Sequence, residues 1–113
     1  MPIEIILTGT CADPDGYRRL ADEMCAAAAA EPGTIRYDWQ LSADGAFRNV
    51  DVYADEAAFL AHFTASQANG LLDRYLVVTR LERVDVLGTV TGEARDVLVD
   101  HGANFLEPVG SIR

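Results

Sequence analysis

Four polar residues between positions 49 and 62 have the types and the spacing that proton-transfer chemistry requires. Asn49, Asp51 and Tyr53 alternate along the chain, and residues two apart lie on the same face of a β-strand. His62 follows in an apolar segment with helical spacing. An imidazole or a carboxylate can remove a proton from a bound molecule, and an amide N–H can stabilise the oxyanion that forms. We therefore predict that His62 or Asp51 is a general base, that Asp51 otherwise orients His62, and that Asn49 and Tyr53 hold the oxyanion.

These four residues also have structural interpretations, which the sequence leaves open. A histidine on a helix can lie at the surface, or it can be hydrogen-bonded within the core. A row of polar side chains on one strand face can bond to a partner subunit instead of a substrate. His101 stands just before Gly102, where a predicted helix ends, and a cation suits the negative end of the helix dipole. We therefore assign His101 a structural role.

Five aromatic residues are candidates for binding a flat substrate. Tyr37 and Trp39 lie two positions apart in a predicted strand, whereas Phe59, Phe63 and Tyr75 lie in predicted helices. Aromatic rings commonly line small-molecule pockets and stack on planar ligands. Packing of the same rings in a hydrophobic core is the alternative interpretation.

The segments that must position these side chains follow a β-α-β-β-α-β order. Alternation of apolar and polar residues predicts strands over 3–10, 34–41, 46–53 and 80–88. Helical spacing predicts one helix from Pro14 to the Pro32-Gly33 break, a second over 56–64 extended by 67–77, and a third that runs to Val99. The expected N-caps are Asp13, Asp55, Ser66 and Thr91. Asp44-Gly45 predicts a tight turn, so that 34–53 forms a hairpin whose first strand places Ile35, Tyr37, Trp39 and Leu41 on one face.

This element order predicts an α+β, ferredoxin-like fold with a four-stranded antiparallel sheet. Helices can cover only one face of such a sheet, and Val50 and Val52 point to the other face. A second copy of the sheet would cover that face, so we expect a homodimer.

Composition excludes several classes of partner. The net charge is −9 and all basic residues are arginines, which makes binding to nucleic acid or to anionic membranes unfavourable. The sequence has neither a signal-peptide pattern nor an apolar run of the ~20 residues that span a bilayer. Cys11 and Cys25 are not spaced as a metal site or a redox pair, so we expect free thiols and a cytoplasmic protein. Arginine in place of lysine, with abundant alanine, indicates a bacterial source.

A longer pattern in the chain resembles a known family. The sequence reads Glu31-Pro32-Gly33-x-x-x-Tyr37, and then Asp51-x-Tyr53-x-Asp55-x-x-Ala58-x-x-x-His62-x-x-x-Ser66. This pattern is similar to that of the antibiotic biosynthesis monooxygenase (ABM) family, whose members are dimeric α/β barrels. The resemblance divides the chain into an ABM-like domain over 1–91 and a C-terminal helix and tail over 92–113, which we expect to dock on the domain or on a partner subunit.

The resemblance implies a cofactor-independent monooxygenase that oxidises a small aromatic phenol, anthrone or quinol with O₂, without flavin or metal. Its cleft would lie between the sheet and the helices. Asp51 stands where the family usually has Glu. Relatives that degrade haem have Ser-x-x-His after the second helix, whereas this chain has Ser66 followed by Asn69, which disfavours haem binding. A non-catalytic dimer that binds a small apolar ligand or acts in stress remains an alternative, so the sequence leaves open whether the protein is an enzyme.

Overall fold

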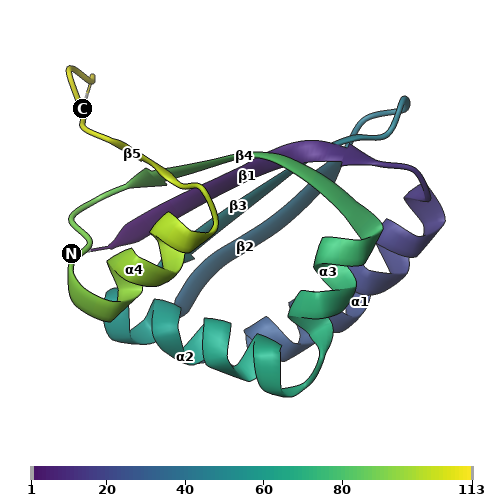
Figure 1. Cartoon of the computed structure of the whole chain (residues 1–113), viewed down its shortest axis with the longest axis horizontal. Coiled ribbons are helices and arrows are strands. Elements are labelled where there is room, and N and C mark those ends of the chain that lie inside the picture. Colours follow the sequence, from purple (N-terminus) through teal and green to yellow (C-terminus); the bar gives the residue numbers. More distant parts are fainter. Residues whose placement is uncertain (1, 113) are drawn as a thin grey trace.

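The computed structural model describes residues 2–112. Met1, the first residue of the predicted domain over 1–91, and Arg113, the last residue of the predicted tail over 92–113, lie outside the described residues. Four helices lie along one side of a five-stranded sheet (Figure 1). The elements are β1 (Ile3–Cys11), α1 (Pro14–Ala29), β2 (Thr34–Leu41), β3 (Ala46–Tyr53), α2 (Glu56–Ala68), α3 (Leu71–Val78), β4 (Thr79–Leu87), α4 (Gly92–Asp100) and β5 (Asn104–Leu106). No helix within residues 2–112 is long and apolar enough to cross a membrane.

The sheet has the strand order β2-β3-β1-β4-β5. The first four strands are antiparallel neighbours, which confirms the predicted ferredoxin-like fold. The fifth strand was not predicted. β5 pairs in parallel with β4 through Asp85–Asn104, Val86–Phe105 and Leu87–Leu106, so the sheet is mixed. The C-terminal segment thus docks on its own chain through β5, while Val109 and Ile112 beyond it are fully exposed.

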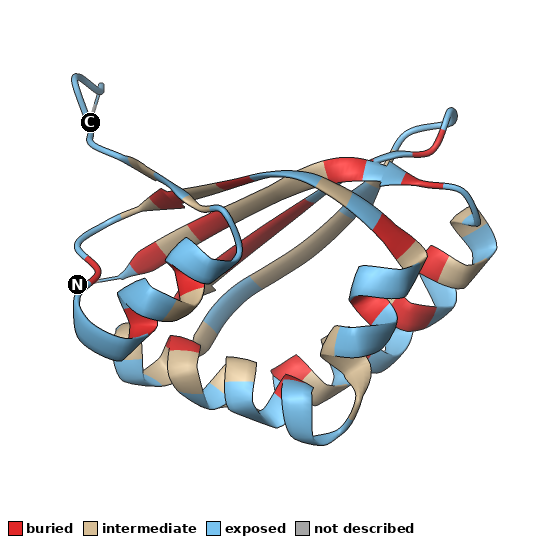
Figure 2. Cartoon of the chain, in the orientation of Figure 1, coloured by how far each residue is buried: buried red, intermediate tan, exposed pale blue. Residues whose placement is uncertain are grey.

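Strand register places the candidate residues of β3 on the side of the sheet that the helices cover. Asn49 faces Trp39 on β2, and Asp51 faces Tyr37, so these four residues share one face. β1 lies on the other side of β3, where Ile5 pairs with Asp51. Buried positions therefore concentrate between the sheet and the helices (Figure 2).

The hydrophobic core consists of two clusters on that side of the sheet. One cluster joins β1 and β4 to α2 and α4, and it includes Ile5, Tyr53 and Phe59. The other joins α1, β3 and α3 around Tyr17 and Tyr75. The pocket described below lies between the two clusters, and side chains from both clusters line it.

Short side chains fix the starts of the two long helices as the sequence predicted. The carboxylate of Asp13 accepts a hydrogen bond from the Gly16 N–H, and that of Asp55 accepts one from the Ala58 N–H. Ser66, in contrast, was predicted to begin a new helix but lies within α2. The chain breaks at Gly70 instead, where φ is +78°, a conformation that glycine adopts without steric strain.

The prediction that Ile35 shares a face with Tyr37 and Trp39 was wrong. The register between β2 and β3 shifts between Thr34 and Arg36, so one extra residue enters β2 at this point. Ile35 is 62% exposed as a result. The alternation that brings Tyr37 and Trp39 to the helix side starts only after this bulge.

Within residues 2–112, no helix covers the opposite face of the sheet (Figure 1). Ile6 and Val52 are partly exposed there, while their neighbour Val50 is only 1% exposed. This face carries the apolar residues that the sequence analysis assigned to a dimer contact.

Candidate active site

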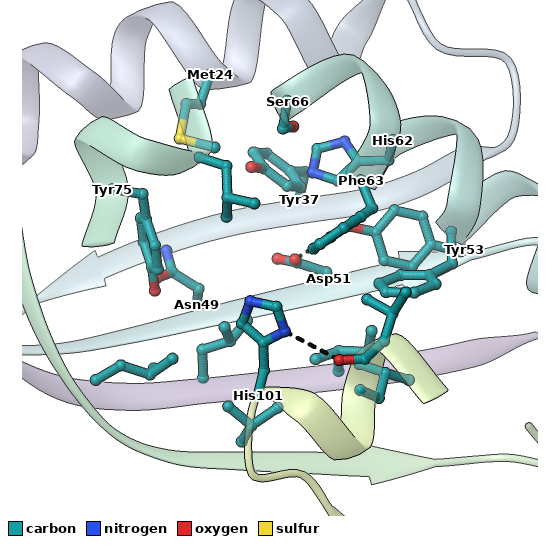
Figure 3. Close-up of a pocket in the computed structure, with 18 of the residues that line it drawn as sticks. Met24, Tyr37, Asn49, Asp51, Tyr53, His62, Phe63, Ser66, Tyr75 and His101 are labelled. Carbon is teal, nitrogen blue, oxygen red and sulfur yellow. Dashed lines mark hydrogen bonds between the residues drawn. The ribbon is translucent and has the colours of Figure 1, made fainter. Parts of the chain in front are cut away.

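The pocket lies between the inner face of the sheet and helices α1 to α4, and it encloses about 720 Å³ that no atom fills, part of it open to solvent. Its wall is mainly apolar and aromatic, with a few polar atoms from β3, α2 and the end of α4 (Figure 3). The nine residues predicted for the site all line it: Tyr37, Trp39, Asn49, Asp51, Tyr53, Phe59, His62, Phe63 and Tyr75.

His62 is oriented by Glu31, a carboxylate that the sequence analysis did not assign to the site, whereas Asp51 bonds to Tyr53. Nδ1 of His62 lies 2.7 Å from Oε1 of Glu31, in the turn after α1, and both side chains are mostly buried. A carboxylate accepts hydrogen bonds, so Nδ1 carries the hydrogen and Nε2 of a neutral ring keeps its lone pair. The ring lies at the pocket, where it contacts the rings of Tyr37 and Tyr53 at 5.1 and 5.3 Å between centroids. The site therefore contains a Glu-His pair that suits a general base.

Asp51 is a buried carboxyl group with one unpaired oxygen. Its Oδ2 accepts a hydrogen bond of 3.1 Å from the Tyr53 hydroxyl, whereas its Oδ1 is buried without a partner among the described residues. Burial raises the pKa of Asp51 to about 7; the Tyr53 hydrogen bond opposes this rise, and the nearby charge of Asp38 adds to it. A carboxyl group with such a pKa exchanges a proton readily near neutrality.

Asn49 is fixed by two tyrosines. Its Oδ1 accepts a hydrogen bond of 2.7 Å from the Tyr75 hydroxyl, and its Nδ2 donates one of 3.2 Å to the Tyr17 hydroxyl. The Tyr17 hydroxyl in turn donates to the carbonyl of Gln40. An amide nitrogen carries two hydrogens, so one N–H of Asn49 is left for a ligand in the pocket. Burial raises the pKa of Tyr17 and of Tyr75 well above the usual tyrosine value, which keeps both hydroxyls neutral.

Tyr37 and Trp39 form the β2 side of the wall. Their ring centroids are 6.2 Å apart, and the Trp39 ring meets the Tyr75 ring edge-on at 5.5 Å. The indole N–H of Trp39 is buried without a hydrogen-bond partner among residues 2–112. A buried donor without a partner is costly, and a polar atom of a ligand or a water in the pocket would satisfy it.

His101 also lines this pocket, although the sequence analysis gave it a structural role. No sequence signal could reveal this position, because it depends on how α4 packs across α2. Glu31, Tyr17 and Met24 were likewise missed, since their contacts join segments that are far apart in the chain. Among the described residues, no group of three or more His, Cys, Asp or Glu side chains is placed to hold a metal ion.

Asn69 occupies the position where the haem-degrading branch would have a histidine. It ends α2, and its side-chain oxygen accepts a hydrogen bond from the Leu71 N–H. Its side chain thus stabilises the turn between α2 and α3.

The sequence matches a known protein family, and the structure is similar to solved structures. Residues 13–70, about half of the chain, match the family model of the antibiotic biosynthesis monooxygenases. The curated proteins include no significant match. Solved structures match at low identity and therefore show similarity of fold.

MupZ from Pseudomonas fluorescens is similar over 99% of this chain and 93% of its own, at 15% identity and a TM-score of 0.83. SnoaB from Streptomyces nogalater, a cofactor-independent oxygenase, is similar over 81% of this chain and 96% of its own, at 15% identity and a TM-score of 0.67. A protein from Caulobacter crescentus that is named as an antibiotic biosynthesis monooxygenase is similar over 80% of this chain and 91% of its own, at 18% identity and a TM-score of 0.68.

Proposed function

Because the chain belongs to the antibiotic biosynthesis monooxygenase family, we propose that it is a cofactor-independent monooxygenase that oxidises a small aromatic phenol, anthrone or quinol with O₂. One observation carries the proposal. A paired imidazole, His62, and a buried carboxyl group with a free oxygen, Asp51, line the same aromatic pocket. The likeness of the fold to SnoaB, a cofactor-independent oxygenase, supports the same reaction class.

The first step is removal of a proton from the substrate. Nε2 of His62 accepts the proton, while the Glu31 carboxylate holds Nδ1–H and stabilises the imidazolium that forms. In an anthrone, the C–H bond breaks and its electron pair delocalises over the ring system as an enolate. Asp51 remains an alternative base when it is ionised, since its Oδ1 has no other partner among the described residues.

The electron-rich anion then reduces O₂ directly. It passes one electron to O₂, and the substrate radical and superoxide combine to form a C–O bond and a peroxide anion. His62 returns its proton to that anion. Over the whole reaction, a CH₂ group and O₂ become a carbonyl group and water, so the substrate supplies all the electrons.

Asn49 and Tyr53 have different roles in this proposal. The free N–H of Asn49 stabilises the enolate oxygen, since Tyr17 and Tyr75 hold its amide in place. The Tyr53 hydroxyl, in contrast, already donates to Asp51, so it orients this carboxyl group instead of holding the oxyanion.

Oxygen uptake measured with an electrode, with anthrone and a hydroquinone as probes, tests the function. We expect uptake that depends on the protein and the formation of the corresponding quinone. A wild-type protein that binds these probes but consumes no oxygen above the uncatalysed rate would contradict the proposal and favour the non-catalytic binding dimer.

The assembly that we propose is a homodimer. The uncovered sheet face carries Ile6 and Val52, which are partly exposed, and a second copy of the same face would bury them.

A further inference from the structure

His101 has the properties of a second proton-transfer group in the pocket. It caps the C-terminal end of α4, where its own N–H donates to the carbonyl of Leu98. Gly102 follows with φ at +77°, and the Ala103 N–H bonds back to Leu98 before the chain enters β5. This helix end and the pairing of β5 with β4 hold the His101 backbone in place.

The orientation of the ring determines which nitrogen can react. Nδ1 of His101 lies 2.9 Å from the carbonyl oxygen of Val97. A carbonyl oxygen can only accept, so Nδ1 carries the hydrogen and Nε2 of the neutral ring keeps its lone pair. Phe63 packs edge-on against the ring at 5.5 Å between centroids. Figure 3 shows the other ring nitrogen facing the pocket.

Two imidazoles with the same internal arrangement therefore line the pocket, although His62 is largely buried and His101 is exposed. Each has Nδ1 bonded to an oxygen, from Glu31 for His62 and from Val97 for His101, and no hydrogen bond joins either Nε2 to another described residue. They belong to different elements, α2 and the end of α4, and Asp51 lies between them in the view of Figure 3. His101 also lies outside residues 13–70, the part that matches the family model.

We propose that His101 removes the second of the two protons that the substrate must lose. This role rests on the oxidation proposed above. After the first step, the carbon that bears the hydroperoxide still carries one hydrogen. Nε2 of His101 takes this proton, the C–H electron pair forms the carbonyl double bond, and the O–O bond breaks. The hydroxide that leaves accepts the proton from His101 and becomes water, so the two imidazoles end the cycle neutral.

Two proton acceptors on different elements suit this sequence of steps. His62 is protonated by the first transfer and gives its proton to the peroxide. A second base can then act on the remaining C–H bond without moving the substrate. Nδ1 of His101 bonds to the neutral amide carbonyl of Val97, whereas Nδ1 of His62 bonds to the Glu31 carboxylate. Without a carboxylate partner, the imidazolium of His101 can release its proton to hydroxide.

The test compares His101→Gln with His62→Gln and with the surface control Asp100→Asn in single-turnover reactions with anthrone. We expect His62→Gln to slow both oxygen uptake and quinone formation. His101→Gln should keep oxygen uptake within about threefold of wild type but slow quinone formation by about 10²-fold, the lower range for loss of a general base. The anthrone hydroperoxide should accumulate and be detected by mass spectrometry. Anthrone deuterated at the reacting carbon should show a larger isotope effect on quinone formation in His101→Gln than in wild type.

Three results would overturn the role of His101. Quinone formation at the wild-type rate in His101→Gln would remove it from the reaction, and equal slowing of uptake and quinone formation would place it in the first step or in folding. A ¹⁵N spectrum showing hydrogen on Nε2 of the neutral ring would contradict the tautomer. A lack of oxygen uptake by the wild-type protein, in contrast, would contradict the proposed function itself.

Discussion

Nδ1 of His62 and Oε1 of Glu31 lie 2.7 Å apart, although the two residues are 31 positions apart in the chain. This contact joins α2 to the turn between α1 and β2. It fixes the tautomer of His62, so the reactivity of the imidazole depends on a residue that does not line the pocket.

Loss of the His62 imidazole should lower turnover more than loss of the Glu31 charge. We expect His62→Ala to decrease the rate of anthrone oxidation by about 10²–10⁴, the usual contribution of a general base. Glu31→Gln keeps the imidazole and removes only its charged partner, so its effect should be smaller. Oxygen uptake at saturating anthrone measures both rates, with Glu107→Gln in the exposed tail as the control. A wild-type rate in His62→Ala would remove His62 from the mechanism.

The stability of the protein should fall as pH rises through the range in which Asp51 titrates. Its pKa is raised from 3.8 to about 7, so between these values the folded chain holds a proton that the unfolded chain has released. The contribution of protonated Asp51 to the free energy of unfolding is fully present below about pH 4. It is lost as pH rises through 7, and the loss is on the order of 4 kcal/mol. Asp51→Asn removes this group. Urea unfolding at pH 4 and pH 8 should show that the stability of wild type relative to Asp51→Asn falls by this amount.

The matching control for Asp51 is Tyr53→Phe. This substitution removes the hydrogen bond that lowers the pKa of Asp51, so the ¹³C carboxyl resonance of Asp51 should titrate at a higher pH than in wild type. If the relative stability of wild type and Asp51→Asn were the same at both pH values, Asp51 would not titrate in this range.

Tyr75→Phe should impair turnover through Asn49. The substitution removes the 2.7 Å hydrogen bond to Oδ1 of Asn49, which frees the amide to rotate. We expect kcat to fall by about fivefold to tenfold, the equivalent of a hydrogen bond worth about 1 kcal/mol, with little change in KM. Adding Tyr75→Phe to Asn49→Ala should then have almost no further effect. Equal effects of Tyr75→Phe in both backgrounds would show that Tyr75 acts independently of Asn49.

Charges on the uncovered sheet face should separate the proposed dimer. We expect wild-type protein to sediment at twice the 12.2 kDa mass of one chain, and the double variant Ile6→Glu/Val52→Glu to sediment as single chains. Val77→Glu is the control, because Val77 is 85% exposed on α3 and lies on the other side of the sheet. A wild-type protein that sediments as a single chain at micromolar concentration would contradict the dimer.

Local patterns predicted most of the fold. Strands 34–41 and 46–53 have the predicted bounds because alternation and the Asp44-Gly45 turn indicate the same hairpin. The bulge at Ile35 could not be predicted. An inserted residue leaves the alternation of apolar and polar residues in the sequence intact, but it changes the face of the sheet on which Ile35 lies. β5 has three residues, too few for a periodic signal, and it forms only because β4 offers a free edge.

The part of the pocket wall that the hairpin forms could be predicted from the sequence. Register brings Tyr37 next to Asp51 and Trp39 next to Asn49 once the strands pair. The partners of these residues depend on tertiary packing instead. Glu31 meets His62 only after α2 folds back over the hairpin, and His101 reaches the pocket only because α4 packs against α2.

The unpaired indole N–H of Trp39 gives the protein an intrinsic spectroscopic reporter. Trp39 is the chain's single tryptophan, so its emission comes from the pocket wall alone. A ligand that stacks near this indole, or bonds to its N–H, changes the wavelength and intensity of that emission. Fluorescence titration of the unlabelled protein can therefore rank candidate substrates by affinity before any turnover is measured.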